Sequence, residues 1–298
     1  MDSIFPATAV TRADLLDLCG ALDMPGDVRA QIDACLRGAD LTPYDQHFAA
    51  LLSPQSAAAG LEAFAAAVPP ETGWIVTLIA HLTAALHRKP VLYDARGIPN
   101  PIFLDTMGCF TRFVREHMAS FGRYGFDRAF WTWRQINGLL FRLGTLEFEM
   151  VRLSNTGMSR ISPPAAEPDA PILSVHIPSD AALTREALDA SYLQARVFFR
   201  DTHPLYRYVM TGCSSWLLAP RLKTLLRPDS GILRFQADYE ILHENPDADD
   251  AMTWVYKRPY ARPEDLPEDT SLQRGLKSIM IAGGHLGSGT GILRPGLV

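Results

Sequence analysis

The segment 172–199, ILSVHIPSDAALTREALDASYLQARVFF, contains two different periodicities. Its first six residues are mostly apolar or β-branched, and Pro178 ends them, so a strand is predicted over 172–177. Thr184 is a favourable N-cap residue, and a helix is predicted after it. The apolar residues of that helix recur on one face, at Leu188, Tyr192, Ala195, Phe198 and Phe199. A strand that leads into an amphipathic helix is typical of an α/β domain.

Toward the C-terminus the pattern predicts further strands and helices in mixed order. Strands are predicted over 206–218, over 233–241 after Ser230-Gly231, and over 252–257, and helices over 221–226 and 272–281. In 233–241 polar residues alternate with apolar ones, so the strand would have one polar face. The polar residues of this face are Arg234, Gln236, Asp238 and Glu240. Such a face is usually solvated, but Asp238 or Glu240 would recognise a cationic amine if other elements cover it.

Toward the N-terminus, the spacing of the apolar residues changes at Gly144. Beyond it, apolar residues alternate with Glu147 and Glu149, which predicts a strand with one solvated face. Before it, the pattern is helical, ending in two aromatic helices over 102–120 and 127–141. The segment 159–171 contains four prolines and is the best domain boundary. We therefore expect a mostly helical domain over 1–165 and an α/β (α+β) domain over 166–298.

Composition excludes several classes of function. The net charge is −5 with scattered basic residues, which argues against a nucleic-acid partner. The longest apolar run, 74–86, is too short to span a bilayer. The four cysteines lie far apart and the eight histidines show no metal-binding spacing, so neither a disulfide framework nor a metal site is expected. With no signal peptide over 1–6, these features favour a cytoplasmic protein that acts on a small molecule.

Four short strings resemble one known family. They are FRLG at 141–144, HIP at 176–178, CSSWLL at 213–218 and ILRFQ at 232–236. They look like a bacterial family of GNAT-like acyltransferases, in which a helical N-terminal acyltransferase domain precedes a GNAT-like mixed-sheet domain. The resemblance implies transfer of an acyl group from an acyl-CoA thioester to a small amine or similar nucleophile. It implies acyl-CoA as a co-substrate and no permanently bound cofactor.

One position departs from the GNAT pattern. GNAT enzymes place Q/R-x-x-G-x-G/A after a central strand, where backbone N–H groups hold the pyrophosphate of CoA. Here residues 177–184 are IPSDAALT, with no glycine, and Asp180 would repel a phosphate. The alternative function is therefore a non-catalytic ligand-binding or regulatory module that keeps the fold and has lost CoA binding.

Candidate catalytic residues follow from the resemblance and from side-chain chemistry. His176, at the end of its predicted strand, would take a proton from an attacking amine, although a structural strand-end histidine is the commoner case. Ser214 or Ser215 would donate a proton to the leaving thiolate or orient the substrate, and Trp216 would line the substrate site. Cys213 offers a third interpretation, a cysteine hydrolase, which requires a histidine close to it in the fold.

A glycine-rich segment over 283–291 is the remaining candidate. Gly284, Gly287, Ser288 and Gly289 fit the spacing of a phosphate-binding loop, but the segment follows a predicted helix rather than a strand. The alternative is a turn and a terminal strand that other backbone approaches closely.

Overall fold

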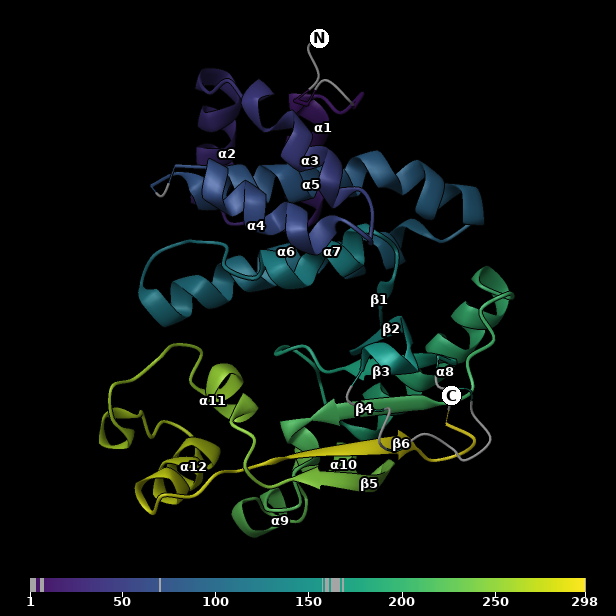
Figure 1. Ribbon diagram of the computed structural model, residues 1–298, viewed down its shortest axis with the longest axis vertical. Coiled ribbons are helices and arrows are strands. Elements are labelled where there is room, and N and C mark those ends of the chain that lie inside the picture. Colours follow the sequence, from purple (N-terminus) through teal and green to yellow (C-terminus); the bar gives the residue numbers. More distant parts are fainter. Residues whose placement is uncertain are drawn as a thin grey trace. The chain divides into compact units, whose positions relative to one another are not determined.

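The computed structural model describes residues 4–5, 8–69, 71–156, 158, 161, 167 and 169–297. The chain forms two compact units, Met1–Phe141 and Arg142–Val298 (Figure 1). This division lies before the boundary expected at 165, because the strand that follows Gly144 pairs with the next strand of the C-terminal unit. Most of the proline-rich segment 159–171 falls outside the described residues.

The N-terminal unit is helical, as predicted. Its α-helices are α1 (Arg12–Ala21), α2 (Gly26–Gly38), α3 (Asp45–Leu51), α4 (Ala57–Ala67), α5 (Gly73–Leu92), α6 (Asn100–Phe121) and α7 (Ala129–Ile136). Helix α5 is the central element, since it contacts each of the other six and most of its residues are buried. It extends past Pro90, although a proline inside a helix removes a backbone hydrogen bond. The following residues, Leu92 and Tyr93, are buried, and this packing offsets the lost backbone bond.

Helix α7 is shorter than the helix predicted over 127–141. It ends at Ile136, and Gly138 then adopts a positive φ of 63°. This conformation suits glycine, and it turns the chain out of the helix. The residues after it form the first strand.

The C-terminal unit is built on a mixed six-stranded sheet. Its strands are β1 (Leu140–Leu143), β2 (Leu146–Arg152), β3 (Pro171–His176), β4 (Thr211–Ser215), β5 (Tyr239–Asn245) and β6 (Ser288–Leu293), in the spatial order β1-β2-β3-β4-β6-β5. Strands β3 and β4 are parallel, whereas the pairs β2–β3, β4–β6 and β5–β6 are antiparallel. Its α-helices are α8 (Arg185–Thr202), α9 (Leu222–Leu225), α10 (Gly231–Ala237), α11 (Asp250–Val255) and α12 (Ser271–Ile281). The α+β fold class predicted from sequence is confirmed.

Three strand predictions in this unit are wrong in part or in whole. The first half of 233–241 belongs to helix α10, because the Ser230 hydroxyl caps that helix by accepting from the Leu233 N–H. The segment 252–257 overlaps helix α11 and packs through Tyr256 into a core cluster with Leu276. The segment 206–218 contains a strand only over 211–215. A short alternating pattern is therefore a weak predictor of strands in this unit.

Helix α8 packs against one face of the sheet. The Ser191 hydroxyl donates to the Leu143 carbonyl and accepts from the Leu146 N–H, so it joins the helix to both ends of the β1–β2 turn. Gly144 in that turn has a φ of +68°, and a Cβ there would lie 3.2 Å from the Ser191 Cα. The same sheet face carries Phe148, Val175 and other buried apolar side chains. This apolar face forms part of the core of the unit.

Candidate active site

The two parallel strands separate at their carboxyl ends. β3 and β4 pair only at Leu173 with Thr211 and at Ser174 with Gly212. Beyond that point each described strand continues with a different neighbour, β3 with β2 and β4 with β6. In open α/β sheets, ligands bind at the carboxyl ends of parallel strands where neighbouring segments diverge. This point of separation is therefore the candidate active site.

The register places polar side chains on one face of the sheet here. Directly opposite residues share a face, and Glu147 lies opposite His176, Glu149 opposite Ser174, and Ser214 opposite Thr290. The polar face is therefore made of Glu147, Glu149, Ser174, His176, Ser214 and Thr290. The solvated face predicted for β2 is wrong, because Glu147 is only 2% exposed and Glu149 only 8%.

His176 and Glu149 form a direct pair on the polar face. The His176 Nε2 and the Glu149 Oε2 are 2.8 Å apart, and both side chains are largely covered, at 23% and 11% exposed. The two residues are diagonal neighbours across β2 and β3. A carboxylate at Nε2 favours the imidazole tautomer with its proton on that nitrogen, which leaves the basic lone pair on Nδ1. The sequence did not identify Glu149 as a site residue, because its place beside His176 depends on the register between β2 and β3.

The structure separates the three residues predicted at the end of β4. Ser214 is exposed on the polar face, and its hydroxyl lies 3.0 Å from that of Thr290. Ser215 points to the opposite face, where its hydroxyl accepts from the Leu217 N–H and caps the 3₁₀ turn Trp216–Leu218. Trp216 packs against an apolar core cluster. The register brings Ser214 to the level of His176, whereas Ser215 and Trp216 have structural contacts.

Asp238 and Glu240 do not share a strand face as predicted. Asp238 is buried, and its carboxylate accepts from Arg185 at 2.6 and 3.2 Å and from the Tyr192 hydroxyl at 3.1 Å. These partners already satisfy its charge. Glu240 is exposed on β5, which is the last strand of the sheet in spatial order.

The loop between β3 and α8 lacks glycine, but arginines lie beside it. Asp180 pairs with Arg142 at 2.7 Å, so its charge is compensated. The Leu183 carbonyl accepts from Arg234 at 2.9 Å. Arg185 begins α8, next to the capping residue Thr184. The three arginines come from separate parts of the chain, which explains why the sequence did not show them together at this loop.

The glycine-rich segment forms a turn and strand β6. A Cβ at Gly289 would overlap the Leu218 carbonyl oxygen, and one at Gly291 would lie 2.7 Å from the Glu240 carbonyl oxygen. Gly287 has a φ of +82°, and Gly284 and Ser288 flank the same turn. These glycines allow close backbone approach, as the alternative interpretation of this segment expects.

Cys213 lies on the apolar face, opposite to His176 and Ser214. Its side chain is fully buried, and burial raises the pKa of the thiol to about 12. The thiol therefore stays protonated at neutral pH. This position and protonation state do not suit a cysteine nucleophile.

Comparisons with known proteins agree with this architecture. Residues 13–138 match the model of the N-acyltransferase N-terminal domain, and residues 140–293 match the GNAT-like C-terminal domain. A comparison with curated proteins gives no match. No described helix is both long and apolar enough to cross a membrane.

Solved acyltransferase structures share the fold. One, in complex with decanoyl-CoA and teicoplanin, is 21% identical with a TM-score of 0.79, over 97% of this chain and 91% of that one. Another, a mutant acyltransferase in complex with octanoyl-CoA, is 22% identical with a TM-score of 0.79, over 98% and 92%. The resemblance found in the sequence is confirmed, and the chain belongs to the family defined by the GNAT-like C-terminal domain, here preceded by an N-acyltransferase N-terminal domain.

Proposed function

We propose that this protein transfers an acyl group from an acyl-CoA thioester to a small amine or similar nucleophile where β3 and β4 separate. The observation that carries the proposal is the His176–Glu149 pair at that point. The solved relatives that hold octanoyl-CoA and decanoyl-CoA support a donor of medium chain length. A CoA-dependent enzyme with four free cysteines also favours a cytoplasmic location.

His176 acts as the general base in the proposed reaction. The amine nitrogen attacks the thioester carbonyl, and a proton of the amine passes to the imidazole, directly or through a water molecule. Glu149 stabilises the imidazolium that forms, because its carboxylate accepts the Nε2–H bond. The attack forms the C–N bond, and collapse of the tetrahedral intermediate then re-forms the carbonyl and breaks the C–S bond.

Ser214 assists the leaving group. The CoA thiolate released in the last step takes up one proton, which the Ser214 hydroxyl, hydrogen-bonded to Thr290, would relay from the His176 imidazolium or from water, so that serine and histidine both return to their neutral forms. Backbone N–H groups where the two parallel strands separate would stabilise the oxyanion of the intermediate. The Ser215 hydroxyl instead caps the 3₁₀ turn that follows β4, so it has no role in the proposed mechanism.

The donor's phosphates would be held by side chains rather than by a glycine loop. Arg142, Arg185 and Arg234 all lie beside the β3–α8 loop, where the GNAT pattern places the pyrophosphate. Guanidinium groups bind phosphate oxygens through paired N–H donors. The acidic pairing partners of Arg142 and Arg185, Asp180 and Asp238, would set the geometry of these side chains.

The test is a turnover assay that follows release of the CoA thiol. The chain is supplied with octanoyl-CoA or decanoyl-CoA and a panel of amines that includes teicoplanin. We expect His176→Ala to lower kcat by about 100-fold or more, the usual contribution of a general base, with little change in Tm. His87→Ala, in the N-terminal unit, is the matched control. Unchanged turnover in His176→Ala would remove this residue from the mechanism.

Calorimetry with the same acyl-CoA donors, combined with the turnover assay, tests the non-catalytic alternative. If calorimetry shows saturable donor binding but no acceptor gives turnover, the protein is a ligand-binding module with an acyltransferase fold. If no acyl-CoA binds, the altered β3–α8 loop has abolished donor recognition and the proposed function is wrong.

A further inference from the structure

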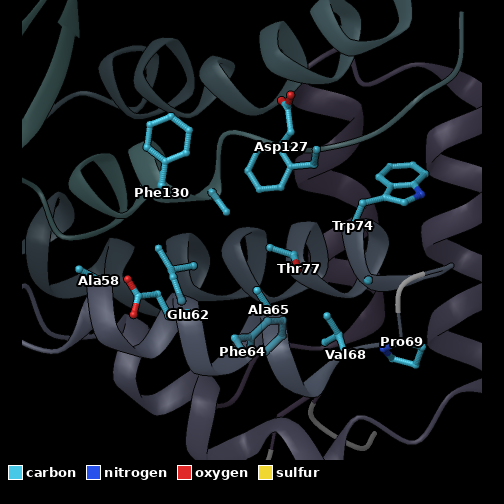
Figure 2. A pocket seen from close by; sticks show the side chains of 14 residues that line it. Ala58, Glu62, Phe64, Ala65, Val68, Pro69, Trp74, Thr77, Asp127 and Phe130 are labelled. Carbon is cyan, nitrogen blue, oxygen red and sulfur yellow. The ribbon is translucent and has the colours of Figure 1, made fainter. Parts of the chain in front are cut away.

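A pocket of about 570 Å³ lies within the N-terminal unit (Figure 2). It is lined by helix α4, the start of α5 and the segment 126–130 before and within α7. This volume falls in the range of small-molecule binding sites. Nothing in the proposed acyl transfer accounts for it, because the residues of the His176 site belong to the other unit.

The walls of the pocket are mostly apolar. Helix α4 contributes Ala58, Leu61 and Ala65, which share one face at helical spacing. The two alanines are small, so this face leaves room beside it. Figure 2 shows Ala65 in the middle of the pocket, with Phe130 and Trp74 toward opposite ends. Phe130 is 57% exposed, so its ring lies on the open side of the pocket.

The charged residues that line the pocket are all acidic. Two of its lining residues are acidic, Glu62 and Asp127, and no lysine, arginine or histidine lines it. Asp127 pairs with Arg128 at 3.0 Å. Glu62 forms no ion pair among the described residues and is exposed beside the alanine face of α4. The uncompensated charge next to the apolar walls is therefore the Glu62 carboxylate.

We infer that this pocket binds an amphiphilic organic cation, with its apolar body against Ala58, Ala65 and Phe130 and its ammonium group at Glu62. An anionic ligand, such as a fatty acid or an acyl-CoA, would leave its charge beside a carboxylate and is disfavoured. The residues that line this pocket belong to the N-terminal unit, whereas those of the proposed donor site belong to the C-terminal unit. The inference holds whether or not the protein transfers acyl groups.

The first test compares three eight-carbon probes by calorimetry with the full chain, each kept below its aggregation concentration. We expect octylammonium to bind more tightly than 1-octanol, and octanoate to bind most weakly. Glu62→Gln should weaken octylammonium binding by about 3- to 5-fold, as expected for a partly exposed ion pair. Asp17→Asn, the same loss of charge on α1 outside the pocket, should leave binding unchanged. Octanoate binding as tightly as octylammonium would overturn the inference.

The second test fills the pocket. Ala65→Phe places a ring where the apolar body would lie and should weaken octylammonium binding by 10-fold or more. Ala66→Phe is the matched control, because Ala66 is the next exposed residue of α4 and does not line the pocket. Equal binding by the two variants, or no binding of octylammonium to the unchanged chain, would show that the pocket is not a binding site for such cations.

Discussion

At the scale of single residues, the proposed chemistry depends on a carboxylate that holds an imidazole. We expect Glu149→Gln to lower kcat about 10-fold or more, because an amide stabilises the imidazolium less than a carboxylate. The glutamine still accepts a hydrogen bond, so Tm should change little. Turnover assays and thermal unfolding measure both effects. Glu240→Gln, which removes an exposed carboxylate of β5, is the control. Equal turnover in the two variants would contradict a positioning role for Glu149.

His81 provides a prediction about pH and stability. Burial in the core of the N-terminal unit lowers the pKa of its imidazole to about 4. The unfolded chain, with a pKa near 6.5, therefore binds more protons between these values. The free energy of unfolding should fall as pH decreases from about 6.5 to 4, by up to ~1.4 kcal/mol per pH unit from this residue.

Denaturant titrations across this range measure the effect. His81→Leu replaces the titrating imidazole with an apolar side chain of similar size. The variant should show a shallower loss of stability on acidification than the unchanged chain. Parallel pH dependences in the two proteins would mean that His81 is not buried in its neutral form.

At the scale of secondary-structure elements, the sequence predicts best those elements that carry their own end signals. Helix α8 begins at its cap Thr184, and helix α12 begins with a capping box at Thr270. Helix α10 also has a cap, Ser230, but alternation of apolar and polar residues continues from it into β5 and hides the boundary. Local pattern cannot distinguish these cases because the deciding contacts are tertiary.

The sequence predicts only some residues of the candidate site, because strand pairing brings the others there. His176 and Ser214 stand out as reactive side chains at predicted strand ends. Glu149 does not, since alternation makes it look solvated. Its burial and its contact with His176 depend on the register between β2 and β3, a long-range property of the sheet.

Strand β6 allows a test at this scale. Gly289→Ala should lower the free energy of unfolding by about 1–3 kcal/mol, the usual cost of overpacking, because its Cβ would overlap the backbone of Leu218. Gly108→Ala in α6 is the control, since no atom lies within 4 Å of its Cβ position. That variant should be neutral or more stable. Denaturant unfolding distinguishes the two.

At the scale of the whole molecule, the chain consists of two compact units. Ile79 is fully buried in α5, and Ile79→Ala should destabilise the N-terminal unit by about 2–5 kcal/mol. Hydrogen exchange should show lost protection in α5 and α6 and unchanged protection in β3, β4 and β6. Equal loss in both units would show that they unfold as one.

The position of β6 between β4 and β5 has a consequence for the order of folding. Ser214 and Thr290, which face each other across β4 and β6, are 76 residues apart in the sequence. Contacts of such high sequence separation form late and slowly. Until β6 inserts, the inner edge of β4 has open hydrogen-bonding groups that a second chain could pair with. The step that protects this molecule from aggregation is thus the same step that completes its candidate active site.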